Sequence, residues 1–510
     1  MSHPLQYAPV LVIGAGIMGS GIAQTAAQAG HPVFLYDARE GAAVESRTKL
    51  ATTLNGLVAK GRLEAAAAEA AIARITPINT LTDAATARLA IEAIVELLEP
   101  KRELFRQLEA ILADDAVLGT NTSSISVTAI AAGLKHPGRL AGMHFFNPVA
   151  LMKLVEIVSG LQTDPQVAAS LFDLAALWGK VPVHAKSTPG FVVNRIARPF
   201  YAEALALLQE QAAGPEVLDA CLKAAGFRMG PCELMDLIGH DTNLAVTRSV
   251  FEANFFDKRY QPSVVQSEMV AGGLLGRKSG RGFYSYPQGA AALPAADRSP
   301  PDRAVTITLH GQGALADALG EAAARVLGAN GTPLARDMSS DPTSHWIGLE
   351  IDGARLVLTQ GLAAWDLAAR SGVTDTAVFD RPLRLPMQPG QIIAYSVNAA
   401  ASAAWQGQAG AWLQALGFAP QRVSDAPGLV VARTVAMLIN EAADAVLQGV
   451  CTTAGADSAC KLGVNYPAGP FEWLREWSVP GVIAVLESLD SAYRGERYRV
   501  SPWLRRGVAS

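Results

Sequence analysis

Residues 10–30 read VLVIGAGIMGSGIAQTAAQAG, and they put four glycines beside what should be the start of a helix. Glycine is a poor helix former, so its repeated use here needs a reason. Val10–Ile13 is a short apolar run rich in β-branched residues, which is typical of a buried strand. Gly14, Gly16 and Gly19 follow in the spacing G-x-G-x-x-G, and a helix-compatible segment completes the stretch. The stretch therefore predicts a strand, a tight turn and a helix in immediate succession.

This glycine spacing suits a dinucleotide. Gly14 permits the tight turn, Gly16 lets a pyrophosphate approach the backbone, and Gly19 lets the helix pack closely on the strand. The helix N-terminus offers unbonded N–H groups to the phosphates. A second strand-like run ends at Asp37, where a carboxylate can bond the ribose hydroxyls of NAD. That carboxylate would repel the 2′-phosphate of NADP, although Arg39 nearby leaves the preference open, and a glycine-rich turn without a ligand is the alternative.

Length and composition limit the class of protein. The chain has 510 residues, enough for two to four domains, and half of them are hydrophobic. A net charge of −4 argues against nucleic acid as the main partner. Four cysteines without a C-x-x-C pair fit a reduced, cytoplasmic chain better than a disulfide framework or a zinc site, so we expect no metal. The N-terminal segment does not resemble a signal peptide, and no apolar run reaches the ~18 residues of a membrane helix.

Several later strand-like runs end in polar residues. Val117-Leu118 is followed by a polar segment that contains Ser123, and the run at Leu140–Met143 ends at His144, with Asn147 close behind. In a parallel sheet the carboxyl ends of the strands face the ligand crevice. Ser123, His144 and Asn147 are therefore expected to converge near the cofactor.

Taken together, these motifs resemble the L-3-hydroxyacyl-CoA dehydrogenase family. The resemblance covers roughly residues 8–286 in unbroken order, and it rests on GAGIMGSGIAQ (14–24), EAIVE (92–96), NTSS (121–124), HFFNPV (144–149), MKLVEIV (152–158), STPGFVVNR (187–195) and GRKSGRGFY (276–284). It implies a Rossmann-type α/β domain with a doubly wound parallel sheet, followed by an all-α domain.

The resemblance also implies the catalytic residues. His144 matches the general base and Glu156 its carboxylate partner, while Ser123 and Asn194 match the residues that hold the substrate oxygens. The chemistry suits these residue types, because a histidine titrates near neutral pH and a carboxylate on its other nitrogen fixes the tautomer. Each residue also has a plain structural alternative: a satisfied histidine, a surface carboxylate, and helix-capping or turn roles for the serine and the asparagine.

By the same resemblance, further positions match residues that contact the cofactor or coenzyme A. The expected NAD-binding set is Gly14, Gly16, Ile17, Met18, Gly19, Asp37, Glu96, Lys101, Asn147 and Lys278. Thr53 and Lys60 fall where the family touches coenzyme A, although a solvated helix face explains Lys60 almost as well.

The second half of the chain is predicted to be a partial repeat of the first. DAPGLVVARTVAMLINEAADAV (425–446) aligns with residues 187–208, but Ala432 stands where Asn194 stands in the first copy. We therefore expect a structural second copy, preceded by a degenerate Rossmann-like segment without a complete phosphate loop. The expected domains are 1–187 (NAD-binding Rossmann), 188–286 (helical, substrate and dimerisation), 287–303 (linker), 304–422 (degenerate Rossmann-like) and 423–510 (second helical repeat and tail).

The resemblance predicts NAD-dependent oxidation of a (3S)-3-hydroxyacyl-CoA to the 3-oxoacyl-CoA, in fatty-acid or phenylacetate-type catabolism. The alternatives are a dehydrogenase of a non-CoA hydroxy acid and a non-catalytic NAD-binding protein. The partner is expected to be an acyl-CoA, with an intrachain pseudo-dimer of helical domains and the option of a homodimer. The architecture resembles bacterial members acting on short acyl-CoA, including 3-hydroxyadipyl-CoA. Such a dicarboxylic substrate would need a cation near its tail, for which Arg195, Arg198 and Arg228 are the candidates.

Overall fold

The chain folds into two compact units. The computed structural model describes residues 3–290, 292–293, 301–302, 304–328, 334–337, 346–383 and 386–507. The first unit comprises residues 1–196 and 445–464, and the second comprises residues 197–444 and 465–510. Much of the linker expected at 287–303 lies outside the described residues.

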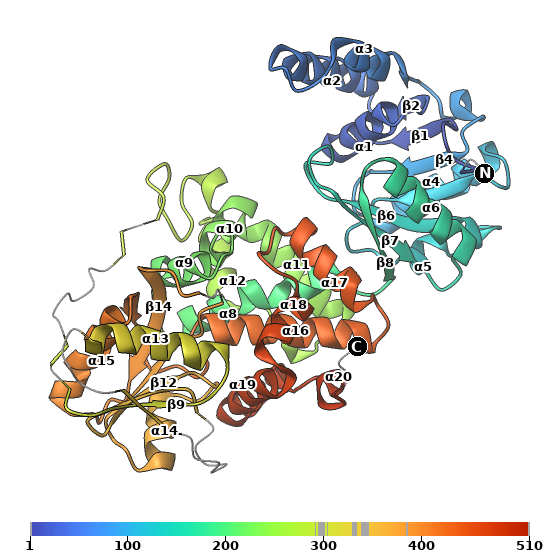
Figure 1. Ribbon diagram of the computed structural model, residues 1–510. Coiled ribbons are helices and arrows are strands. Elements are labelled where there is room, and N and C mark those ends of the chain that lie inside the picture. Colours follow the sequence, from blue (N-terminus) through green and yellow to red (C-terminus); the bar gives the residue numbers. More distant parts are fainter. Residues whose placement is uncertain are drawn as a thin grey trace. The chain divides into compact units, whose positions relative to one another are not determined.

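The first unit is built on an eight-stranded sheet with the order β3-β2-β1-β4-β5-β6-β7-β8 (Figure 1). Its strands are β1 Val10–Ile13, β2 Val33–Tyr36, β3 Ile75–Pro77, β4 Leu89–Glu92, β5 Val117–Thr120, β6 Leu140–Phe145, β7 Leu154–Ser159 and β8 Val181–Lys186. Its helices of eight or more residues are α1 Ile17–Gln28, α2 Ala42–Ala59, α3 Ala65–Ala73, α4 Leu98–Ile111, α6 Pro165–Leu177 and α17 Thr453–Gly463; the shorter ones are α5 Val127–Ala131 and α7 Val193–Ile196.

This sheet is Rossmann-like, as the sequence predicts. The strand order reverses at β1, which pairs in parallel with both β2 and β4. That reversal makes the carboxyl end of β1 the point where an α/β sheet of this kind binds its ligand. The sheet departs from a purely parallel one at β7, which runs antiparallel to β6. β6 also continues through Phe145, so His144 lies inside a strand rather than at its end.

The second unit contains a seven-stranded mixed sheet with the order β10-β9-β11-β12-β13-β14-β15 (Figure 1). Its strands are β9 Ile307–His310, β10 Leu334–Arg336, β11 Gly348–Ile351, β12 Ala354–Leu358, β13 Thr376–Phe379, β14 Gln391–Val397 and β15 Phe418–Arg422. Helices α13 Ala314–Gly328, α14 Ala364–Ser371 and α15 Ala403–Ala415 belong to the same segment, and Trp405, Trp412 and Phe379 lie in its core.

The remaining helices come from the two predicted helical repeats. The first repeat supplies α8 Arg198–Gln209, α9 Pro215–Ala224, α10 Pro231–Ile238, α11 His240–Ala253, η3 Lys258–Tyr260, α12 Val264–Ala271 and η4 Arg277–Ser279. The second supplies α16 Val431–Leu447, α18 Pro470–Trp477, α19 Val479–Tyr493, η6 Glu496–Tyr498 and α20 Pro502–Arg505.

The two repeats contact each other through matching ion pairs. On α8, the buried Glu203 is bound by Arg433 of α16 at 2.7 Å and by Arg497 of η6 at 2.8 Å. On α16, Glu441 accepts a hydrogen bond of 2.6 Å from Tyr260 of η3 and pairs with Arg259 at 3.4 Å.

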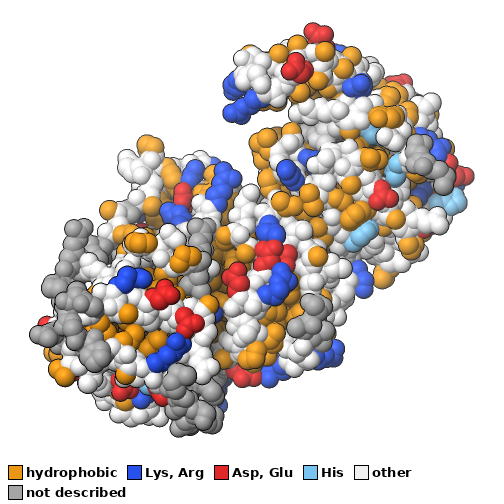
Figure 2. All heavy atoms as spheres, in the orientation of Figure 1, with side chains coloured by type: hydrophobic (Ala, Val, Ile, Leu, Met, Phe, Trp, Pro, Cys, Tyr) orange, Lys and Arg blue, Asp and Glu red, His pale blue; other side chains and the backbone are white. Residues whose placement is uncertain are grey.

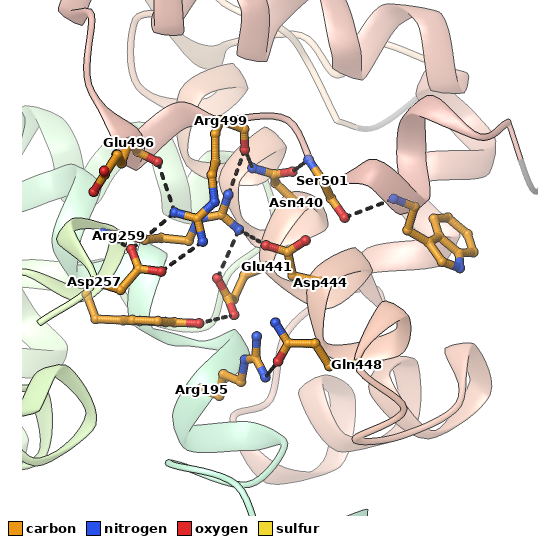
Figure 3. Close-up of polar contacts among 12 residues, drawn as sticks. Arg195, Asp257, Arg259, Asn440, Glu441, Asp444, Gln448, Glu496, Arg499 and Ser501 are labelled. Carbon is orange, nitrogen blue, oxygen red and sulfur yellow. Dashed lines mark hydrogen bonds and ion pairs between the residues drawn. The ribbon is translucent and has the colours of Figure 1, made fainter. Parts of the chain in front are cut away.

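The pairing is reciprocal. Glu203 and Glu441 occupy equivalent positions in the aligned repeats, as do the RY pairs at 259–260 and 497–498. Each repeat therefore offers its glutamate to the arginine and tyrosine of the other. Figure 3 shows the second of these clusters, with Arg259 directed at Glu441 and Asp444.

The charged side chains and the cysteines are arranged as follows. Basic and acidic side chains lie among one another on the face shown in Figure 2. All four cysteines are free and buried. Among the described residues there is no helix long and apolar enough to cross a membrane and no cluster of three or more metal-ligating side chains.

Candidate active site

The glycine turn after β1 has the shape that phosphate binding needs. Gly14 has φ +101°, and a Cβ there would come within 2.4 Å of the Ala93 carbonyl oxygen. A Cβ on Gly19 would lie 1.7 Å from the Gly14 carbonyl oxygen, so α1 can pack this closely only without a side chain. A Cβ on Gly16 would meet no atom within 4 Å, so the space over the turn is open.

The N-terminus of α1 is left without a protein cap. Its N-cap, Gly16, makes no side-chain hydrogen bond, and the first helical turn carries no acidic residue. Asp37, at the end of β2, accepts hydrogen bonds from the Ala15 N–H at 2.7 Å and the Arg39 N–H at 2.9 Å. A carboxylate has further lone pairs to offer a ribose hydroxyl. These residues fit NAD: an uncapped helix start for the pyrophosphate and a carboxylate beside it.

His144 and Glu156 form a buried pair. They face each other directly in the antiparallel register of β6 and β7, where side chains on neighbouring strands come closest. The distance between His144 Nδ1 and Glu156 Oε2 is 2.6 Å. The rings of Phe146 and Phe191 lie 4.6 Å and 5.8 Å from the imidazole, so apolar groups surround it.

The second oxygen of Glu156 fixes the next element. Its Oε1 accepts hydrogen bonds from the backbone N–H groups of Val192 at 3.2 Å and Val193 at 2.9 Å, at the start of α7. A carboxylate held by two N–H donors is an acceptor, so Nδ1 of His144 is the donor in the pair and Nε2 keeps a free lone pair. Asn194 follows on the same short helix, and Glu156 therefore positions both His144 and the segment that carries Asn194.

Glu96 plays a comparable part for Ser123. Its Oε1 accepts hydrogen bonds from Thr122 Oγ1 at 2.7 Å, from the Ser123 N–H at 2.8 Å and from Ser123 Oγ at 3.2 Å. Its other oxygen lies 3.2 Å from Lys101 Nζ. Burial would raise the pKa of Glu96, but the Lys101 cation and the hydrogen bonds outweigh it and lower the pKa to about 2. The carboxylate thus stays ionised and holds the Ser123 loop.

Lys101 is buried beneath this loop. It pairs with Glu92 at 2.5 Å, and Glu92 is fully buried and also accepts a hydrogen bond from Thr120 Oγ1 at 2.7 Å. The sequence prediction included Lys101 and Glu96 but missed Glu92 and Thr120. The available signal was a charged residue inside the apolar run LAIEAIV (89–95), which marks either an edge or a buried pair.

A cavity of about 350 Å³ joins these groups above the glycine turn. Seven of its lining residues were predicted from the sequence as catalytic or cofactor-binding positions: Met18, Glu96, Lys101, Ser123, His144, Asn147 and Asn194. Asn121 also connects the Ser123 loop to the end of β6, because its Oδ1 accepts a hydrogen bond from the Phe145 N–H at 2.8 Å. The structure therefore brings together all four residues predicted to be catalytic.

Other predicted positions lie elsewhere. Thr53 and Lys60 are exposed on and just after α2, outside this cavity, and Thr53 Oγ1 donates to the Lys49 carbonyl of its own helix. Ile17 is 78% exposed at the start of α1. Lys278 belongs to the second unit, where its Nζ lies 2.5 Å from Asp241.

Comparisons with known proteins agree with this geometry. The family model "3-hydroxyacyl-CoA dehydrogenase, NAD binding domain" matches residues 9–188, and the C-terminal domain model of the same family matches 190–286 and again 428–510. A "3-hydroxybutyryl-CoA dehydrogenase reduced Rossmann-fold domain" model matches 356–427, which overlaps the later part of the degenerate Rossmann-like segment predicted at 304–422.

Individual relatives match either the first half of this chain or nearly all of it. The Escherichia coli 3-hydroxyadipyl-CoA dehydrogenase is 42% identical over 97% of this chain and 96% of its own. The pig mitochondrial hydroxyacyl-coenzyme A dehydrogenase is 40% identical over 54% of this chain and 90% of its own. A crystal structure titled 3-hydroxybutyryl-CoA dehydrogenase, from Escherichia coli, superposes with a TM-score of 0.86 at 41% identity over 98% of both chains. With the glycine turn, the His144–Glu156 pair and both family domains matched, this chain belongs to the NAD-dependent 3-hydroxyacyl-CoA dehydrogenase family.

Proposed function

We propose that this protein oxidises the 3-hydroxyl group of a (3S)-3-hydroxyacyl-CoA, with His144 as the general base and Glu156 as its partner. The observation that supports this most directly is the buried 2.6 Å contact between His144 Nδ1 and Glu156 Oε2 beside a cavity that Ser123 and Asn194 also line. NAD, bound over the glycine turn, supplies the acceptor for the hydride that leaves C3.

His144 handles the proton in this scheme. The hydroxyl proton passes to Nε2 as the C–O bond becomes a carbonyl, and the resulting imidazolium is stabilised by Glu156 through Nδ1–H. The Val192 and Val193 N–H groups hold Oε1 of Glu156 and so orient its Oε2 toward His144. Ser123 and Asn194 hydrogen-bond to the substrate oxygens and hold C3 in place for transfer, with the Ser123 hydroxyl turning from Glu96 Oε1 to the substrate. In the reverse direction the same imidazolium returns the proton.

His144→Ala tests the catalytic assignment. We expect kcat to fall on the order of 10²–10⁴-fold, because a general base is lost, while NADH binding is unchanged. NADH formation is followed by absorbance with 3-hydroxybutyryl-CoA and 3-hydroxyadipyl-CoA, and NADH binding by fluorescence. His136→Gln is the matched control, since His136 is exposed between helix and strand and should keep full activity.

The same assay separates the alternatives. A wild-type protein that binds NADH but turns over no hydroxyacyl-CoA would support a non-catalytic role, and equal turnover of the free 3-hydroxy acids would support a non-CoA substrate. Either result would overturn the proposal. Fatty-acid or phenylacetate-type catabolism and a cytoplasmic location stay predictions of the same kind, because both depend on the substrate and the cell.

We also propose that the second helical repeat takes the place of a partner subunit. In a symmetric dimer each residue i that contacts j is matched by j contacting i. The Glu203 and Glu441 clusters repeat that pattern within one chain, with arginine and tyrosine supplied by the opposite repeat. A homodimer of whole chains would need a further surface.

A further inference from the structure

The second unit contains a cavity of about 480 Å³ whose lining is strongly basic. It lies among residues of α8, α11, η3, the start of α12 and η6. Its charged lining consists of five basic residues, Arg198, Lys258, Arg259, Arg433 and Arg497, and two acidic ones, Glu210 and Glu496.

Three of these arginines are neutralised by the ion pairs of the repeat interface. Arg259 pairs with Glu441, and Arg433 and Arg497 both pair with Glu203. Their charges are therefore accounted for inside the protein. These three arginines make the lining basic, but their ion pairs leave few of their N–H groups free to bind a ligand.

Arg198 is different. It is 7% exposed, yet no carboxylate of the described residues lies within ion-pair distance of its guanidinium. Its Nη1 donates to Thr247 Oγ1 at 3.2 Å, its Nε has no hydrogen-bond partner among the described residues, and the group lies 4.8 Å over the Tyr201 ring. Burial lowers the pKa of Arg198, whereas in Arg433 the effects of Tyr498, Glu203 and Glu210 raise the pKa against the same burial.

A buried guanidinium without an anion is costly, and proteins normally pair it. The cavity holds neutral donors that suit an anion as well. Tyr201 lines it, and so does Ser263, whose buried Oγ has no partner among the described residues. A planar guanidinium binds a carboxylate through two parallel N–H···O bonds, which gives geometry as well as energy.

We propose that the Arg198 cavity binds an organic carboxylate. Resting on the proposed function, its first source is the terminal carboxylate of a dicarboxylic acyl-CoA substrate. The second source is a free dicarboxylate, which would make the cavity a separate ligand site. The names of the two relatives, one a hydroxyadipyl-CoA and one a hydroxybutyryl-CoA dehydrogenase, differ in acyl length and in this terminal carboxylate.

Arg198→Met tests the proposal with little risk to folding. The substitution keeps a long side chain and removes an unpaired buried charge, so the thermal midpoint should not fall. We expect kcat/KM for 3-hydroxyadipyl-CoA to drop on the order of 10²-fold, as for loss of a buried charge pair. For 3-hydroxyhexanoyl-CoA, which has the same length without the carboxylate, it should stay within about twofold. Arg248→Met, at an exposed arginine of α11, is the matched control and should change neither value.

A binding measurement, which does not depend on turnover, distinguishes the terminal carboxylate of the substrate from a free dicarboxylate as the ligand. Adipate should raise the thermal midpoint of the wild-type protein but not of Arg198→Met, with 1,6-hexanediol, which has the same length and no carboxylate, as the negative control. An adipate effect together with equal losses for both acyl-CoA substrates assigns the cavity to a free dicarboxylate. No adipate effect together with unchanged discrimination between the substrates overturns the proposal. If the wild-type protein oxidises neither acyl-CoA, the proposed function fails while the adipate measurement still decides on the cavity.

Discussion

Glu156 and Asp380 show how one carboxylate can serve two purposes or only one. Glu156 accepts the N–H groups of Val192 and Val193 and also binds His144. Asp380, in the degenerate copy, accepts the N–H groups of residues 430–432, which align with residues 192–194, and its bonded partners among the described residues include no histidine. The helix-capping contact has therefore been kept where the imidazole has been lost.

Glu96 provides a pH-dependent test at the same scale. Its pKa in the folded protein lies near 2, below the ordinary 4.5, so its contribution to stability is present above pH 4.5 and lost as pH falls toward 2. We expect Glu96→Gln to lower the thermal midpoint at pH 7, at a cost of about 1 kcal/mol after allowing for partial exposure, and to cost less at pH 3. Circular dichroism melting curves at both pH values measure this difference.

Glu99→Gln is the matched control for this prediction. Glu99 lies nearby on α4, with a side chain that is 72% exposed and forms an ion pair with Arg102. Its removal should have little effect at either pH. A Glu96 variant whose deficit is the same at pH 3 and pH 7 would contradict the assigned charge.

At the scale of the element, the glycine turn separates folding from cofactor binding. Gly19→Ala should be destabilising by about 1–3 kcal/mol, because its Cβ would lie 1.7 Å from a backbone oxygen. Gly16→Ala should leave stability nearly unchanged, because its φ is −69° and nothing lies within 4 Å of the new Cβ. The same methyl group would stand where a pyrophosphate approaches, so NADH affinity should fall at least about tenfold. Melting curves and NADH fluorescence titrations measure the two effects, and a Gly16 variant with normal NADH affinity would contradict them.

The elements show how far the sequence reaches. Local patterns predicted β1 and the turn after it, since apolar runs and glycine spacing depend on neighbouring residues alone. The four predicted catalytic residues came from the family resemblance; three of them, Ser123, His144 and Asn194, line one cavity, and Glu156 contacts His144 behind it. The pairing of Glu92 with Lys101, the antiparallel direction of β7 and the roles of Glu203 and Glu441 were missed. Each of these features depends on which distant segments of the chain contact each other. The sequence alone does not tell whether a charged residue is exposed or buried in an ion pair.

For the whole molecule, the reciprocal clusters predict how the second unit fails. Glu203→Gln would remove the buried carboxylate that the buried Arg433 binds at 2.7 Å and the partly exposed Arg497 binds at 2.8 Å, at a cost of about 3–5 kcal/mol. We expect a calorimetric transition several degrees lower, and a similar shift for Glu441→Gln, which occupies the equivalent position. Glu487→Gln, at an exposed pair with Arg505, is the control. Unequal shifts for Glu203 and Glu441 would contradict the two-fold relation between the repeats.

The two helical repeats differ in sequence, as at Ala432, which aligns with Asn194 of the first repeat, and this difference has a practical consequence. In a dimer of identical subunits, a substitution at the interface occurs in both subunits. In this chain the two repeats have separate sequence positions, so one side of the contact can be changed without changing the other. A single cysteine or dye placed on the outer face of α19 would therefore occur once per chain, which suits distance measurements that a symmetric pair of subunits would blur.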